Sequence, residues 1–136
     1  MPAGYSSTPL SKKLGIKQGH TVALHDEPDE FSELLTHLPD EVAFVEGIPE
    51  RADIVIIFAT ERKVFEAAVP SAADAVFPDG AVWIAWPKKS SKVATDMTED
   101  VVREVALPIN LVDNKVCAIS DVWSGLRIVW RKEHRR

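Results

Sequence analysis

Two uninterrupted apolar runs constrain the fold of this 136-residue chain more than any other feature of its sequence. Residues 53–59 read DIVIIFA and residues 81–86 read AVWIAW. A strand that is apolar at nearly every position is buried on both faces, which is typical of the middle of a parallel sheet. Between the two runs, residues 60–76 carry apolar side chains at helical spacing, with Pro70 as a kink or break. This strand–helix–strand pattern predicts an α/β fold built on an open, mostly parallel sheet.

The other predicted elements extend the same sheet on both sides. Weaker strands are indicated at residues 21–25 and 42–46, and two more at 115–120 and 126–130, joined by a hairpin turn at 121–125. Helices are indicated at residues 9–14, from Phe31 to Leu38, and from Asp96 to Leu107, where Asp96 and Glu99 suit a capping box. The sequence therefore predicts a Rossmann-like sheet of about six strands, with the last strand antiparallel and helices on both faces.

The length fits one domain, residues 1–136, with no repeat or linker dividing it. We take residues 1–20 as a lead-in with a short helix and residues 131–136 as a basic, solvated tail. No stretch resembles a signal peptide or approaches the roughly 18 apolar residues of a membrane span, so we expect a cytoplasmic protein with no membrane partner. The single cysteine, Cys117, lies in an apolar stretch, which favours a buried small hydrophobe over a nucleophile.

Charge is distributed unevenly along the chain, whose formal net charge is −5. Residues 26–53 hold ten acids and one base, whereas residues 127–136 hold five Lys and Arg and one acid, Glu133. A net acidic chain is a poor general binder of nucleic acid, so we expect no nucleic-acid partner.

Four strings carry a resemblance to a known family. They are TPLSKKLGI at residues 8–16, WPKKS at 86–90, TEDVVRE at 98–104 and VWSGL at 122–126. Together they make the chain similar to a family of short bacterial proteins classified only as a domain of unknown function. That resemblance supports the predicted fold and implies no mechanism. The order of elements also resembles a shortened methyltransferase-type Rossmann domain, which likewise ends in a parallel strand with an antiparallel one inserted beside it.

Cofactor chemistry is the first functional class to test. Methyltransferases that use S-adenosylmethionine typically place a glycine-rich turn after the first strand, but residues 25–30 read HDEPDE and contain no glycine. Glu46, which ends the second predicted strand, suits ribose hydroxyls. There is no glycine-rich phosphate-binding string, and the four acids between Asp26 and Glu30 would repel a phosphate. We therefore predict no bound cofactor and keep a divergent methyltransferase as an alternative.

Metal and nucleophilic chemistry have little support either. His25, Asp26 and Glu27 are metal-ligand types, but three successive residues rarely converge on one ion. No serine lies on a strand-to-helix elbow, and Ser124 falls in the predicted hairpin turn. We predict no catalytic residue and no metal ligand.

The best remaining site is geometric, because open α/β sheets bind ligands beyond the carboxyl ends of their parallel strands. The segments expected there supply the following candidate ligand-binding residues: His25, Thr60, Lys88, Lys89, Ser90, Trp123 and Ser124. Lysines and hydroxyls just before a helix suit an anion, although a solvated lysine loop would show the same pattern.

The leading hypothesis from the sequence is thus a non-catalytic Rossmann-like domain that binds a small anionic ligand or a protein partner. Besides the methyltransferase, a regulatory interaction module that uses the basic tail or the N-terminal helix stays open. The oligomeric state is not indicated by the sequence.

Overall fold

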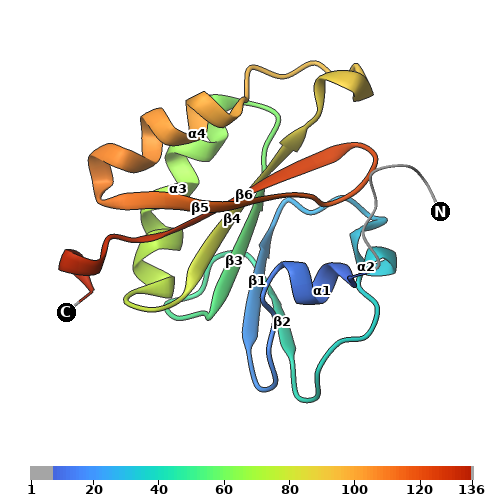
Figure 1. The fold of residues 1–136 in the computed structure, drawn as a ribbon, viewed down its shortest axis with the longest axis vertical. Coiled ribbons are helices and arrows are strands. Elements are labelled where there is room, and N and C mark those ends of the chain that lie inside the picture. Colours follow the sequence, from blue (N-terminus) through green and yellow to red (C-terminus); the bar gives the residue numbers. More distant parts are fainter. Residues whose placement is uncertain (1–7, 136) are drawn as a thin grey trace.

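The computed structural model describes residues 8–135, which form a six-stranded sheet in the order β2-β1-β3-β4-β6-β5 (Figure 1). The strands are β1 Thr21–His25, β2 Ala43–Glu46, β3 Ile54–Phe58, β4 Ala81–Pro87, β5 Leu111–Ala118 and β6 Trp123–Trp130. The α-helices are α1 Leu10–Lys13, α2 Phe31–Leu34, α3 Arg62–Val76 and α4 Glu99–Ala106. Single turns of 3-10 helix span Lys89–Ser91, Leu107–Ile109 and Lys132–His134.

The topology confirms the predicted sheet. Strand β1 pairs in parallel with β2 and β3, and β3 pairs in parallel with β4. Strand β6 is antiparallel to both of its neighbours, β4 and β5, so it is the inserted antiparallel strand. Every residue of β3 and β4 is buried, as their continuous apolar runs predict.

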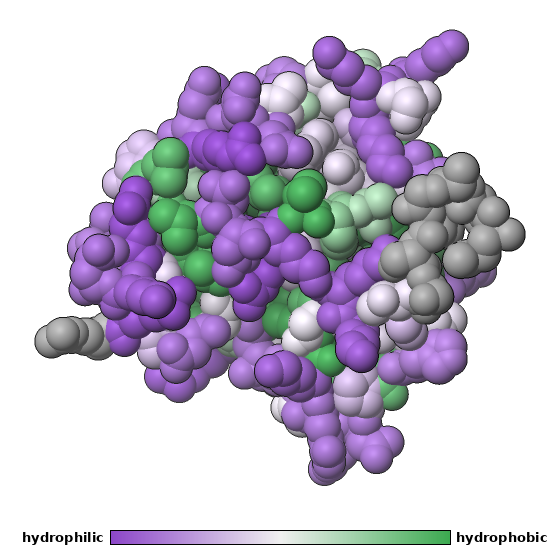
Figure 2. Space-filling view, in the orientation of Figure 1, coloured by the Kyte–Doolittle hydropathy of each residue, from purple (hydrophilic) through white to green (hydrophobic). Residues whose placement is uncertain are grey.

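Helices cover both faces of the sheet (Figure 1). Helices α3 and α4 pack on one face, in a core that includes Phe65 and Val102. Helix α2 contributes Phe31 to a second core on the opposite face, where α1 contributes Leu10 and Leu14 follows it. On the side shown in Figure 2 the surface is largely hydrophilic and apolar side chains form only small separate patches, as expected of a domain with two filled cores.

Several predicted boundaries are wrong, each for a local reason. Helix α2 ends at Leu34 because Leu35 has an extended backbone, with φ −92° and ψ 96°. Thr98 caps α4 by accepting from the Val101 amide, whereas Asp96 accepts at 2.7 Å from the Arg62 amide at the start of α3. The predicted Asp96 capping box is therefore replaced by a contact that joins two helices.

Two further expectations are corrected by the structure. Helix α3 runs through Pro70 without a break. Cys117 is half-buried, not fully buried. In the predicted tail, residues 132–134 are exposed, and Arg135 Nε donates at 2.8 Å to the carbonyl of Trp130. Residue 136 lies outside the described residues. None of the described helices is long and apolar enough to cross a membrane.

Candidate functional site

The strand order creates a crevice at the carboxyl end of the sheet. After β1 the chain goes to β2 on one side, and β3 then pairs on the other side of β1. The loops that leave β1 and β3 therefore diverge, and such a switch point is where open α/β sheets bind ligands. The segments concerned are residues 26–30 and 59–61.

The turn after β1 adopts a left-handed backbone conformation of the kind that usually requires glycine, although it contains no glycine. Asp26 has φ +57°, in the left-handed region that glycine adopts most easily and aspartate tolerates better than most residues. Its carboxylate lies 3.5 Å from His25 Nδ1, which is too long for a hydrogen bond, and that ring nitrogen is buried without a partner among the described residues. The turn therefore keeps the left-handed geometry but projects side chains where a glycine would leave space.

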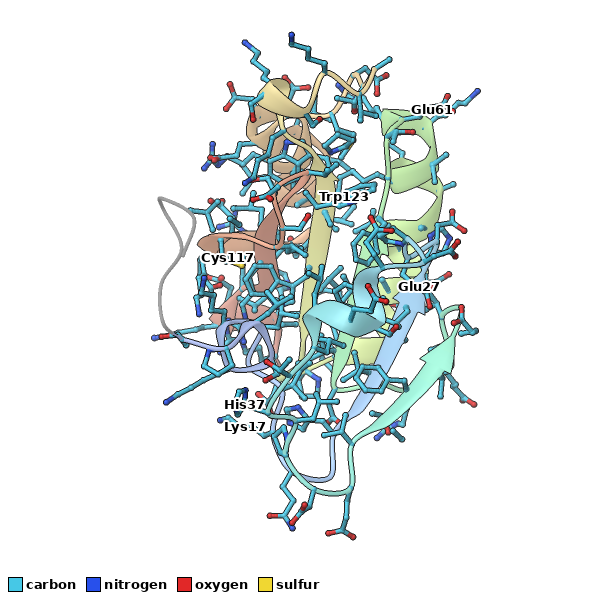
Figure 3. All side chains as sticks on the ribbon, turned by 90° about the vertical axis from the view of Figure 1, so that its right-hand side faces the viewer. Lys17, Glu27, His37, Glu61, Cys117 and Trp123 are labelled. Atoms are coloured by element: carbon cyan, nitrogen blue, oxygen red, sulfur yellow. The ribbon has the colours of Figure 1, made fainter. Side chains whose placement is uncertain are left out.

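Beside this turn lies a groove of about 560 Å³, which we call the acidic groove. It runs between the turn, α2 and the end of β2, and Figure 3 shows Glu27 on this side of the sheet beside α2. Its walls combine apolar side chains with carboxylates: Leu24, Phe31, Leu35, Leu38, Phe44, Glu27, Asp29 and Glu46. Phe44 and Leu38 are each 38% exposed, which is high for such residues. A groove that is apolar on its walls and anionic at its rim suits a small amphipathic cation.

Two of these carboxyl groups interact directly. The exposed Glu46 carboxyl shares a hydrogen bond with that of Glu27, and this bond, followed by slight desolvation and the negative charge of Glu27, raises the pKa of Glu46. Two carboxylates held together repel each other when both are ionised. A bound group that donates hydrogen bonds or carries positive charge would relieve that repulsion.

The structure brings together three of the seven residues predicted from sequence. Lys88, Lys89 and Ser124 line a second groove of about 580 Å³ in front of α4. Arg103 lines it too, but contacts three carboxylates, those of Glu99 at 2.8 Å and of Asp113 and Asp100 at slightly longer distances. The anion-binding potential of this groove therefore rests on its lysines.

The other four predicted residues lie elsewhere. Trp123 is on the opposite face of β6 from Ser124, because side chains alternate along a strand, and it packs edge-to-face on Phe58 with ring centroids 5.2 Å apart. His25 ends β1 in the turn described above. Ser90 is exposed, and Thr60 accepts at its carbonyl from Thr95 Oγ1 at 2.6 Å.

Sequence reasoning noted Glu46 but missed the groove around it. The overlooked signal was the spacing of Phe44 and Glu46, which are two residues apart on a strand and so share one face. An apolar residue on the exposed face of an edge strand, next to a carboxylate, is the pattern that marks this wall.

Comparison with solved structures identifies the fold. A putative type 11 methyltransferase from Sulfolobus solfataricus matches with a TM-score of 0.62 at 15% sequence identity, over 93% of this chain and 95% of its own. An O-methyltransferase of neocarzinostatin biosynthesis, in complex with S-adenosylmethionine, matches with a TM-score of 0.63 at 14% identity over 83% of this chain. The chain spans about half the length of that second protein, 49%.

The chain has a methyltransferase-type Rossmann fold. Magnesium protoporphyrin IX methyltransferase from Synechocystis PCC 6803, with bound S-adenosylmethionine, is a further structural neighbour, with a TM-score of 0.58 at 11% identity over 90% of this chain and 74% of its own. No protein-family model and no curated protein matches the sequence. At these identities the likeness establishes the fold alone.

The residues of this methyltransferase-type fold provide a partial fit to S-adenosylmethionine. Glu46 lies twenty positions after Asp26 at the end of β2, a place and residue type suited to ribose hydroxyls, and the apolar walls beside it suit a nucleobase. The glycine-free turn offers less room for the rest of the molecule.

Proposed function

We propose that this chain binds S-adenosylmethionine in the acidic groove and is a divergent methyltransferase. The observation that carries the proposal is Glu46, which ends β2 in a groove with apolar walls beside the switch point. Structural neighbours with the same fold hold S-adenosylmethionine, which supports the choice of ligand.

Electrostatics favours this ligand over other nucleotides. S-adenosylmethionine carries a sulfonium and an ammonium group against one carboxylate, so it is a net cation. The carboxylates of Glu27, Asp29 and Glu46 attract a cation and repel the phosphates of a dinucleotide. Hydroxyl donors near Glu46 would also relieve its repulsion from Glu27.

Each residue of the groove has a defined part in this proposal. Glu46 would accept hydrogen bonds from the ribose diol, and Phe31 and Phe44 would wall the adenine. When bound, S-adenosylmethionine supplies an electrophilic methyl group. Because Asp26 and Pro28 replace a glycine turn, we expect weaker affinity than a glycine-rich site would give.

A second candidate, a non-catalytic binding domain, is favoured by one specific observation. At the carboxyl edge Phe58 is buried between Phe31 and Trp123, with ring centroids 5.0 and 5.2 Å away. These packed rings would leave a methyl acceptor less room to reach the carboxyl edge between β1 and β3. Such a domain would bind a small ligand without transfer, and Lys88 and Lys89 would then offer an anion site in the second groove.

Calorimetric titration with S-adenosylmethionine tests the proposal, with ATP as a phosphate-bearing comparison. We expect one bound equivalent of S-adenosylmethionine, no comparable binding of ATP, and affinity weakened about tenfold or more by Glu46→Gln, because a hydrogen bond to a charged group contributes about 1.5–3 kcal/mol. Glu50→Gln is the matched control, since Glu50 is an exposed glutamate outside the groove. Absence of binding to the folded protein, or equal weakening by both variants, would refute the proposed site.

A second measurement separates the two candidates. Release of S-adenosylhomocysteine from S-adenosylmethionine in the presence of a small-molecule cell extract would support methyl transfer. Binding without release would favour the non-catalytic domain, and loss of anion binding after Lys88→Ala with Lys89→Ala would then place its ligand in the second groove.

A further inference from the structure

A third groove, of about 540 Å³, lies at the opposite end of the sheet from the acidic groove, where β1, β3 and β4 begin. In Figure 3, Lys17 lies at this lower end and Glu61 at the upper, carboxyl end. We call it the amino-edge groove. Open α/β sheets ordinarily bind ligands at the other edge, so neither the fold nor the proposed methyltransferase activity gives this groove a role.

The amino-edge groove is basic although the chain is acidic. Four cationic side chains line it, those of Lys13, Lys17, Lys115 and Arg127, against the carboxylates of Asp53 and Asp79. Asp53 already accepts at 2.8 Å from the Thr21 amide. Among the described residues, the ion pairs involve none of these four cations. No ion pair within the described part of the chain therefore neutralises them, and four cations against two carboxylates leave the groove with a net positive charge.

Two of the cations face each other directly. Lys115 on β5 and Arg127 on β6 are cross-strand partners, and an irregularity between Asp113 and Lys115 sets this register. Like charges directly opposite each other destabilise a sheet. Burial, and after it the nearby positive charge of Arg135, lower the pKa of Arg127.

The hydrogen bonds of this pair leave donors available. Arg127 Nη1 donates to Asn114 Oδ1 at 3.1 Å, and Lys115 Nζ donates to the Lys13 carbonyl at 2.7 Å. A guanidinium has five N–H donors and an ammonium three, so most remain for another partner. A guanidinium beside three ammonium groups is a donor set suited to an oxyanion.

We propose that the amino-edge groove binds a small multivalent oxyanion, a phosphate- or carboxylate-bearing molecule seated between Lys115 and Arg127 with Lys13 and Lys17 around it. A bound anion would attract both members of the cross-strand pair, Lys115 and Arg127, and so offset their mutual repulsion. The volume of the groove suits a small molecule. Arg135, held against the Trp130 carbonyl, places the basic C-terminal segment near Arg127 and adds to the attraction at long range.

Titration calorimetry at fixed ionic strength, with tripolyphosphate and citrate as probes, tests the proposal. We expect one bound equivalent and a loss of about tenfold or more in affinity for Arg127→Gln and for Lys115→Gln, since each removes a charge-assisted hydrogen bond. Lys63→Gln is the matched control, because Lys63 is an exposed lysine that lines none of the three grooves, and its loss should leave the affinity within about twofold. Tighter binding of tripolyphosphate would indicate a phosphate ligand and tighter binding of citrate a carboxylate, and either supports the site.

Three results would overturn the proposal: neither probe binds the wild-type protein, Lys63→Gln weakens binding as much as Arg127→Gln, or the groove variants bind normally. Thermal unfolding adds a readout that does not depend on the ligand. Without a probe, Lys115→Gln should raise the melting temperature because it removes the repulsion from Arg127, while the stabilisation by tripolyphosphate should be lost. A lower melting temperature without probe would contradict the argument from repulsion.

Discussion

Trp83 joins the N-terminal segment to the centre of the sheet, and its replacement gives a measurable cost. Its side chain is fully buried on β4, and its indole Nε1 donates at 3.0 Å to the carbonyl of Leu14, just after α1. Trp83→Phe would leave that carbonyl buried without a partner, which costs about 1–3 kcal/mol. It also removes roughly 40 Å³ of side chain, which at about 24 cal/mol per Å³ costs about 1 kcal/mol. We therefore expect the free energy of unfolding to fall by about 2–4 kcal/mol.

Trp130→Phe is the matched control for this substitution. Trp130 also donates through Nε1, at 2.8 Å to the Ala73 carbonyl, but it is only half-buried, so water can replace the lost bond and we expect about 1 kcal/mol. Urea unfolding followed by circular dichroism measures both variants, and an unchanged m-value keeps the comparison valid. A loss below about 1 kcal/mol for Trp83→Phe, or equal losses for the two variants, would mean that the buried bond does not hold the segment.

Three further predictions concern single side chains. The raised pKa of Glu46 means that folding favours its neutral form, so the ionised carboxylate destabilises the fold once the pH rises through that pKa. Glu46→Gln should therefore raise the melting temperature at neutral pH. In acid, where Glu46 is neutral in both the folded and the unfolded state, the substitution should leave the melting temperature unchanged. Burial raises the pKa of Cys117, so its thiol should react slowly with a disulfide reagent at pH 7–8 and faster in alkali, and rapid reaction at neutral pH would contradict this. Thr98→Ala should cost about 1 kcal/mol by removing the cap on the Val101 amide, Thr98→Ser should cost less, and chemical unfolding would show both.

The centre of the fold was predictable because its pattern is strong. Strands β3 and β4 are apolar without interruption, so burial on both faces and a parallel neighbour follow from physical chemistry. Helix α2 shows the opposite case. Leu35 and Leu38 continue the helical spacing of Phe31, yet they line the acidic groove from an irregular segment after α2. Spacing alone does not distinguish a helix face from a groove wall.

The grooves were harder to predict than the elements. The amino-edge groove depends on the register of Lys115 with Arg127, which an irregularity at Asn114 sets, and on α1 lying across the sheet. Its residues come from segments more than a hundred positions apart. The sequence nevertheless contains the separation of charge that the structure expresses, because the acids of residues 26–53 and the bases near both ends form distinct groups.

The acidic groove and the amino-edge groove carry opposite net charge, which makes the two proposed sites separable by pH. As the pH falls through the raised pKa of Glu46, the acidic groove loses negative charge, and its affinity for a cation should decrease. A guanidinium stays charged over the same acidic range, so acidification should not remove the charge of Arg127, and the amino-edge groove should keep its affinity for the oxyanion. Added salt, in contrast, should weaken both interactions together, since both are attractions between opposite charges near the surface. If acidification weakened both sites equally, a loss of structure and not the titration of Glu46 would be its cause, and the circular dichroism spectrum at each pH would show it.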